Sequence, residues 1–267
     1  MLRELKKFYA KHGRHTLPWR QFDRPLPAGR QAYKILVSEV MLQQTQVERV
    51  VPYYKKFIKK FPTAQALAGA RLSAVLREWQ GLGYNRRAKY LHDAAKLVVR
   101  GGWGQKLPGV GSYTKHAVEA FAYNKPTVFV ETNIRTVFIH SNILKNVGMI
   151  SDKDLLPLVA RALKKSKMQP RHFYAALMDY GAYLKQSGVR NNSRSAHYTR
   201  QSKFEGSLRQ VRGAILRALS EGPKNEGRLH LLIQLNKQVR RARFGKALEG
   251  LKRDGLIKKE KGKWRIA

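Results

Sequence analysis

Apolar residues recur along most of the chain at intervals of three and four, which is the spacing of one face of an α-helix. Strict alternation of apolar and polar residues, which marks a half-buried strand, is scarce. The pattern predicts helices over residues 2–12, 33–44, 47–61, 64–80, 88–100, 113–123, 133–144, 153–164 and 171–184. A loop is predicted over 22–31, because this stretch holds two prolines and a glycine. We therefore expect an all-α architecture.

The C-terminal part of the chain has a different order of elements. Residues 185–203 are polar, basic and rich in Ser and Asn, which predicts a linker or a loosely packed cap. Three further helices are predicted, at 209–221, 228–235 and 238–254. Two short strands around a tight turn follow them, at 255–260 and 264–266. This order is typical of a winged helix, a module that docks on DNA or protein, although a generic small helical domain is the alternative. We expect domains at 1–200 and 201–267.

The charge of the chain indicates its partner. Lys and Arg total 54 against 17 Asp and Glu, so the net charge is +37 over 267 residues. Such an excess calls for a polyanionic partner, with nucleic acid the first candidate and an anionic membrane the second. No apolar run approaches the roughly 20 residues of a membrane-spanning helix, and the N-terminus lacks the apolar core of a signal peptide. We expect a cytoplasmic, nucleoid-associated monomer.

A glycine-rich segment at residues 107–114 predicts a phosphate-binding turn. Glycine stands at alternate positions, 109 and 111, where it allows a positive φ and the close approach of another group to the backbone. A helix is expected directly afterwards. Backbone N–H groups at a helix start can hold a phosphate. We expect a helix-hairpin-helix that anchors duplex DNA without reading its sequence, and an ordinary turn is the alternative.

Two glutamates are candidates for acid and electrostatic catalysis. Glu39 lies four residues after Ile35 at the border of an apolar stripe, where lost hydration raises the pKa of a carboxyl and suits a general acid. Glu131 lies where an apolar run ends and a helix begins, so the helix dipole favours its ionised form. An anion there would stabilise an oxocarbenium-like sugar. An ordinary surface or helix-terminal glutamate is the alternative at both positions.

Several segments resemble MutY-type A/G-specific adenine DNA glycosylases, members of the helix-hairpin-helix glycosylase superfamily. They are residues 17–20, 38–47, 79–84, 107–114 and 178–182, in the order of the family. The resemblance covers roughly residues 1–200 and implies an all-α, two-lobed core with a cleft for DNA. It also implies double-stranded DNA with a mismatched or damaged base as the partner.

The resemblance also implies roles for single residues. Glu39 matches the acid that protonates the departing adenine, Gln44 a wedge that fills the vacated stack, and Tyr84 an aromatic inserted beside the mismatch. Asn133 matches an Asn that helps hold the sugar and nucleophile, and Tyr113 stands where relatives with lyase activity have Lys. Because Tyr cannot form a Schiff base, a monofunctional enzyme is implied. The expected DNA-binding set is Gln43, Gln44, Leu82, Tyr84, Arg86, Gly109, Val110, Gly111, Ser112, Thr114 and Lys115.

The chain departs from the family pattern at several places. The catalytic Asp of the family falls on Glu131, and a shift of about 1 Å can cost on the order of 10²-fold in rate. The iron–sulfur ligands fall on Lys185, Asn192, Ser195 and Gln201, and the chain has no Cys, so we expect neither cluster nor other metal. The connection at 101–106 is shorter than usual. The winged helix is expected in place of the domain that reads 8-oxoguanine.

These observations predict a DNA N-glycosylase that flips out a mismatched adenine, paired with G or 8-oxoguanine, and hydrolyses its glycosidic bond. Excision of uracil or thymine from mispairs is the alternative within the same class. From other classes, the chain would be a catalytically impaired DNA-structure binder or a winged-helix regulator. The regulator leaves residues 1–200 unexplained.

Overall fold

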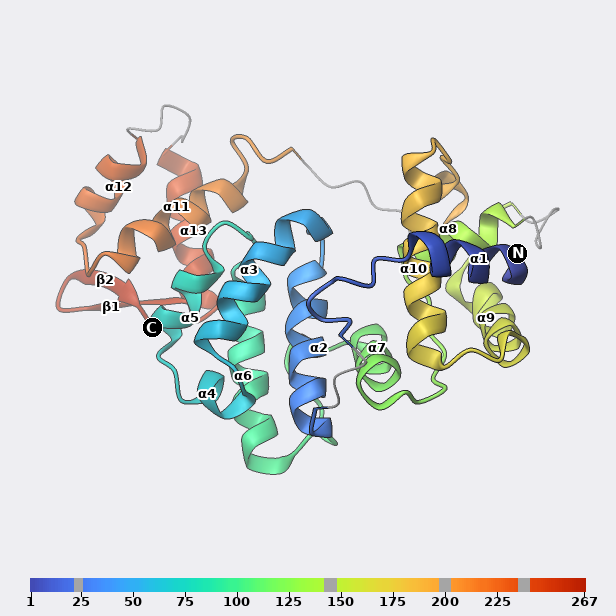
Figure 1. The fold of residues 1–267 in the computed structure, drawn as a ribbon. Coiled ribbons are helices and arrows are strands. Elements are labelled where there is room, and N and C mark those ends of the chain that lie inside the picture. Colours follow the sequence, from blue (N-terminus) through green and yellow to red (C-terminus); the bar gives the residue numbers. More distant parts are fainter. Residues whose placement is uncertain (22–25, 142–147, 197–202, 235–240) are drawn as a thin grey trace. The chain divides into compact units, whose positions relative to one another are not determined.

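The computed structural model describes residues 1–21, 26–141, 148–196, 203–234 and 241–267, and they are mostly helical (Figure 1). The expectation of an α-helical protein is confirmed. The elements are α1 (Leu2–His12), α2 (Ala28–Leu42), α3 (Val47–Lys60), α4 (Ala64–Ala68), α5 (Leu72–Trp79), α6 (Arg86–Gly101), α7 (Ser112–Tyr123), α8 (Thr132–His140), α9 (Asp152–Ser166), α10 (Pro170–Gln186), the 3-10 turn η1 (Asn192–Arg194), α11 (Leu208–Ser220), α12 (Glu226–Gln234), α13 (Arg241–Arg253), β1 (Ile257–Glu260) and β2 (Lys263–Ile266).

The chain forms two compact units, each built from two separate stretches of sequence. The first unit contains Met1–Glu39 and Val110–Arg200, and the second contains Val40–Gly109 and Gln201–Ala267. Helix α2 contributes to both units because the division falls between Glu39 and Val40. The predicted domain boundary at residue 200 stays a prediction.

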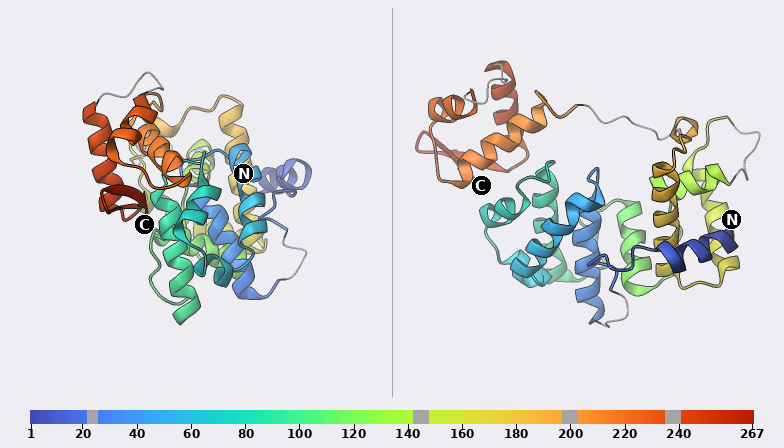
Figure 2. Two further views of the ribbon diagram at one scale, coloured as in Figure 1. Left: turned by 90° about the vertical axis from the view of Figure 1, so that its left-hand side faces the viewer. Right: turned by 45° about the horizontal axis from the view of Figure 1, so that its top comes forward.

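The first unit is centred on α10, which packs against α8 and α1 (Figure 2). Its core is aromatic: the rings of Phe129 and Tyr174 stack with centroids 3.9 Å apart, and Phe173 is fully buried beside them. Gly181 of α10 lies directly against the backbone of α8, where an added Cβ would come within 2.3 Å of the carbonyl oxygen of Asn133. The absence of a side chain at this position therefore sets how closely the two helices approach.

An ion pair joins the loop after α1 to α10. Asp179 is buried, and its carboxylate accepts hydrogen bonds from the backbone and Nε of Arg14, at 2.8 and 2.6 Å, and from Arg20 Nη1 at 2.7 Å. Burial alone would raise the pKa of Asp179, but the two guanidinium groups outweigh it and hold the pKa below its usual value. Two of the segments that resemble the family, 17–20 and 178–182, thus meet in space.

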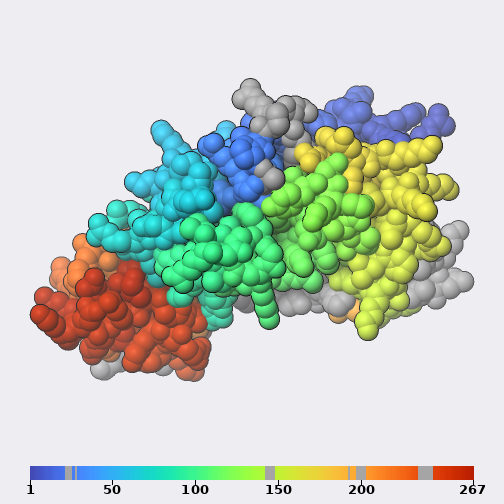
Figure 3. Space-filling model, turned by 90° about the horizontal axis from the view of Figure 1, so that it is seen from below, coloured from blue at the N-terminus to red at the C-terminus, as the bar shows by residue number. Residues whose placement is uncertain are grey.

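In the second unit, α4 and α5 pack against α6 around an aromatic core that includes Trp79, Phe57 and Phe61. The C-terminal residues of this unit form α11, α12 and α13, followed by the antiparallel pair β1 and β2. Lys224, between α11 and α12, forms an additional bridge to Trp264 of β2. Figure 3 shows these C-terminal residues, in orange and red, beside the blue-to-green residues of the same unit.

Two predicted boundaries are wrong. The helix expected over 64–80 is two helices, because Gly69 ends α4 by donating its N–H to Gln65 O and Arg71 starts α5. The loop expected over 22–31 is shorter, since α2 already begins at Ala28, where the carbonyl of Pro27 accepts the first helical hydrogen bonds. A proline just before a helix has a preset φ and needs no N–H partner, so it can start one. The predicted helix ends at 144 and 235 lie outside the described residues.

Candidate active site

Glu39 is buried near the end of α2, and its closest polar partner is Tyr113. The side chain of Glu39 sits among the apolar residues of the α2 core face, and the residue is 6% exposed. Tyr113 is the second residue of α7, and its hydroxyl donates a hydrogen bond of 2.7 Å to Glu39 Oε2. The hydroxyl therefore reaches Glu39 from the first turn of α7, directly after the glycine segment.

This environment gives Glu39 an unusual pKa. The pKa of Glu39 is raised to about 7, because burial and the negative charge of Glu131 together outweigh the hydrogen bond from Tyr113 and the charge of Arg20, which lower it. Burial and the neighbouring carboxylates also raise the pKa of the Tyr113 hydroxyl well above its usual value. Near neutral pH, Tyr113 therefore remains a proton donor while Glu39 can either hold or release its own proton.

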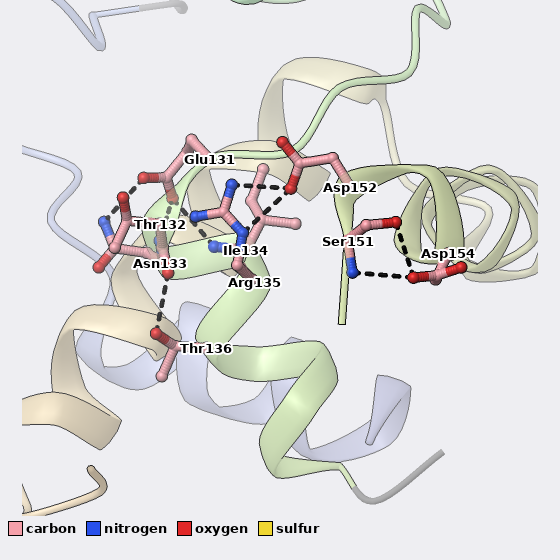
Figure 4. A network of polar contacts seen from close by, with 9 residues as sticks. All are labelled: Glu131, Thr132, Asn133, Ile134, Arg135, Thr136, Ser151, Asp152 and Asp154. Carbon is pink, nitrogen blue, oxygen red and sulfur yellow. Dashed lines mark hydrogen bonds and ion pairs between the residues drawn. The ribbon is translucent and has the colours of Figure 1, made fainter. Parts of the chain in front are cut away.

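Glu131 is the N-cap of α8. Its Oε1 accepts hydrogen bonds from the backbone N–H groups of Asn133, at 2.7 Å, and Ile134, at 2.9 Å, as Figure 4 shows. Short side chains such as Asp or Ser usually take this position. The extra methylene of Glu131 is accommodated because the carboxylate turns back onto the helix start, where the unpaired N–H groups favour a negative charge.

Asn133 connects Glu131 to a lysine of α10. The Asn133 amide nitrogen lies 3.4 Å from Glu131 Oε2, and its Oδ1 accepts a hydrogen bond of 2.7 Å from Lys185 Nζ. Burial lowers the pKa of Lys185, while the charge of Glu131 acts in the opposite direction. Because Lys185 can only donate, it orients the amide of Asn133 so that the NH₂ group faces the carboxylate.

Arg135, one turn into α8, is paired separately. Its Nε and Nη2 both reach Asp152 Oδ1, at 3.0 and 2.7 Å, at the start of α9. Figure 4 shows this guanidinium beside Glu131, with its dashed lines running only to Asp152. The Arg135 charge is thus partly balanced from α9, whereas Glu131 accepts hydrogen bonds from the helix start and lies beside the amide of Asn133.

In the second unit, Gln44 and Tyr84 both have a left-handed backbone, with φ of 56° and 48°. Such conformations are uncommon for residues with a side chain and often occur at functional sites. Both loops are held by Arg87 of α6, a buried residue that sequence analysis missed. Its guanidinium donates to the carbonyls of Val40, Met41, Gln43, Leu82 and Gly83.

The remaining predicted DNA-binding residues differ in exposure. Gly109 has a φ of 70°, and an added Cβ would lie 2.8 Å from Tyr90, so glycine is required there for two reasons. Leu82 and Thr114 are buried, at 5% and 3% exposure, and the structure does not bring their side chains to the surface. The other members of the set are exposed or half-buried; they are Gln43, Gln44, Tyr84, Arg86, Val110, Gly111, Ser112 and Lys115.

The positions that would hold an iron–sulfur cluster do not fit one. The Lys185 amine is already bonded to Asn133, and Ser195 is buried in a bridge with Ile150. Gln201 lies outside the described residues. Neither an amine nor a hydroxyl replaces the thiolates that such clusters need, and the whole chain has no Cys. In the part of the chain that the structure describes, His, Asp and Glu form no group suited to a metal ion.

Three contributors to these sites were not found from the sequence: Arg20, Arg87 and Lys185. Each acts through contacts with residues distant in sequence, and a single basic residue in a chain with 54 of them carries no local signal.

The described helices include none that is long and apolar enough to cross a membrane.

Comparisons with known proteins identify relatives of this chain. The family model of the HhH-GPD superfamily of base excision DNA repair proteins matches residues 37–160. The adenine DNA glycosylase of Mycolicibacterium smegmatis is 37% identical over 280 residues, which cover 95% of this chain and 91% of that protein. The adenine DNA glycosylase of Homo sapiens is 35% identical over 183 residues, covering 63% of this chain and 33% of that protein.

The fold also occurs among solved structures. A trapped covalent intermediate of endonuclease III with DNA, in an estranged-adenine complex, matches with a TM-score of 0.52 and 18% identity. The match covers 72% of this chain and 87% of that chain, and at this identity it shows the fold alone. The sequence relationships go further: the chain belongs to the adenine DNA glycosylases of the HhH-GPD superfamily of base excision DNA repair proteins.

Proposed function

We propose that this chain is a monofunctional DNA glycosylase that extrudes a mismatched adenine from duplex DNA and hydrolyses its N-glycosidic bond. The observation that carries the proposal is the Glu39–Tyr113 hydrogen bond in a buried setting that brings the pKa of Glu39 to about 7. A general acid is most effective when its pKa lies near the working pH. A departing adenine needs such a proton, because the electron pair of the broken C–N bond stays on the base, which leaves as an unfavourable anion unless one of its ring nitrogens is protonated.

The other groups of the first unit divide the remaining work. Glu131 supplies a negative charge for the oxocarbenium-like sugar as the bond to the base breaks. Asn133, oriented by Lys185, donates from its amide toward Glu131 and helps to place the sugar and the attacking water. Tyr113 has no amine, so water rather than an enzyme nucleophile completes the reaction. The products are free adenine and an abasic site.

Duplex DNA containing A opposite G or 8-oxoguanine is the proposed substrate, and the protein is proposed to act as a monomer. The net charge of +37 supports binding to a polyanion, and the left-handed backbones of Gln44 and Tyr84 support their role as residues that enter the duplex. No iron–sulfur cluster takes part, because the candidate positions offer no thiolate. Purified protein is therefore expected to be colourless.

A panel of duplexes tests the proposal. Labelled duplexes with A:8-oxoG, A:G, A:T, U:G or T:G pairs would be incubated with the protein and then treated with alkali, which cleaves abasic sites. We expect cleavage of the adenine strand in the first two duplexes only. Cleavage of U:G or T:G duplexes instead would establish the pyrimidine alternative, and tight binding with no cleavage anywhere would establish the DNA-structure binder. Borohydride in the reaction should trap no covalent complex.

A further inference from the structure

The second unit contains a groove between the loop at residues 80–85 and helix α11. Its volume is about 850 Å³, within the roughly 300–1,000 Å³ range of ligand sites. The residues that line it come from both stretches of this unit, and among the described ones are Gln44, Arg49, Tyr84, Arg209, Gly213 and Arg217. Neither Glu39 nor Tyr113 lines it.

Charge and aromatic surface in the groove suit a nucleotide. Three arginines and no acidic residue are found among its lining residues. The guanidinium of Arg209 lies 4.9 Å from the ring of Tyr84 and 5.9 Å from that of Phe204, and it donates a hydrogen bond to the Tyr84 hydroxyl. Arginines that bind phosphate beside aromatic rings that stack on bases are the usual elements of a groove for a nucleic-acid strand.

The two sides of the groove are held together by polar contacts. Asp254, at the end of α13, forms ion pairs with Arg86 of α6, at 2.7 Å, and with Arg212 of α11. Gln80 donates a hydrogen bond of 2.9 Å to the hydroxyl of Ser220 at the end of α11. Helix α11 is therefore fixed against the same loop that carries Tyr84, which is proposed to enter the duplex.

We propose that this groove is a second DNA-binding site, in which Arg209 and Arg217 of α11 bind the backbone of a nucleotide that is not the excised one. The inference rests on the proposed function, since it takes duplex DNA as the ligand. It gives the C-terminal residues a direct part in holding DNA. The nucleotide belongs either to the target strand beside the excised base or to the opposite strand, and its phosphate chemistry is the same in both.

Filling the groove gives the sharpest test. Gly213 lines the groove within α11, and an added Cβ there would meet nothing within 4 Å, so Gly213→Phe extends into open space without straining the helix. Gly245 of α13 has the same open surroundings but does not line the groove, so Gly245→Phe is the matched control. We expect Gly213→Phe to weaken duplex binding several-fold and Gly245→Phe to leave it unchanged. Equal affinities for the two variants would overturn the proposal.

Removing the arginines tests the charge contact itself. Arg209→Ala and Arg217→Ala should each reduce the slope of log affinity against log salt by about one, since each removes one neutralised phosphate. Lys246→Ala and Lys252→Ala, at exposed positions of α13, are the controls and should keep the wild-type slope. If all four variants lose the same slope, the DNA is held by the overall positive charge of the protein rather than by Arg209 and Arg217, and the proposal is overturned.

Uncharged phosphates identify the strand. Single methylphosphonates would be placed through the target or the opposite strand, and binding compared between the wild type and Arg217→Ala. If the two proteins bind a duplex with equal affinity when one particular phosphate is replaced, that phosphate is the one bound in the groove. If no replacement in either strand makes the two affinities equal, the proposal is overturned. Duplex binding is measured separately from adenine excision. The binding results therefore test the groove even if the protein does not excise adenine. Excision by the control Gly245→Phe at saturating DNA should match the wild type.

Discussion

The hydroxyl of Tyr113 donates a hydrogen bond of 2.7 Å to the carboxylate of Glu39, although the two residues lie 74 positions apart in the sequence. The pair unites the two features on which acid catalysis depends: a buried carboxyl whose pKa is about 7, and a donor whose own pKa is too high for it to lose its proton.

The first prediction concerns the acid itself. The single-turnover rate of adenine excision should fall as pH rises through about 7, because the proton on Glu39 is lost. Glu39→Gln should lower the rate by about 10²–10⁴-fold and flatten its pH dependence. Glu4→Gln, an exposed glutamate of the same unit, is the control and should leave the profile unchanged. An unaltered rate for Glu39→Gln would remove Glu39 from the mechanism.

The same variant should be more stable than the wild type in alkaline solution. The pKa of Glu39 in the folded protein is raised above the usual 4.5, so its stabilising contribution is complete below pH 4.5 and is lost as pH rises to about 7. Gln cannot ionise, so Glu39→Gln avoids this loss. Thermal unfolding at pH 8 should show a gain of at most about 3 kcal/mol, and the gain should vanish near pH 4.5. A gain of equal size at both pH values would point to packing instead.

The third prediction isolates the hydrogen bond from Tyr113. Removing this donor destabilises the ionised form of Glu39, so Tyr113→Phe should raise the pKa of Glu39 and move the alkaline limb of the excision profile to higher pH. The rate at low pH, where Glu39 is already protonated, should change less. Tyr123→Phe, at the other end of α7, serves as the control. A limb that moves to lower pH would contradict the assigned direction.

The fourth prediction separates the charge of Glu131 from its capping role. Glu131→Gln removes the charge that is proposed to stabilise the sugar and should lower excision by about 10²–10³-fold. Glu131→Asp keeps both the charge and a good N-cap, so it should stay within about tenfold of the wild type. Duplex affinity should be nearly unchanged in both variants. Full activity of Glu131→Gln would refute the electrostatic role.

The fifth prediction assigns a positioning role to Lys185. Lys185→Met removes the donor to Asn133 Oδ1, so the amide of Asn133 is free to turn and kcat should fall while KM stays nearly constant. Lys185→Arg should restore part of the rate because it can still donate. The control is Lys164→Met, an exposed lysine of α9. A loss in Lys185→Met that Arg does not rescue, with a raised KM, would indicate general disruption of the unit.

Some features of this protein follow from the residues of a short segment and their neighbours in the chain. Helical periodicity places most of the helices, Gly109 predicts its own positive φ, and Glu131 can be placed at a helix start because an apolar run ends there. The net charge alone predicts a polyanionic partner. Errors occurred where a local signal was weak, as at Gly69, where one glycine divides an apparently continuous helix into two.

The tertiary structure decided what depends on residues far apart in the chain. Periodicity put Glu39 at the edge of an apolar stripe, but only packing decides how deeply it is buried and that Tyr113 is its partner. Lys185 becomes a partner of Asn133 because α10 lies against α8, where Gly181 allows close approach. Burial and pairing set the pKa of a carboxyl and the orientation of an amide, and both are properties of the folded surroundings rather than of any single segment.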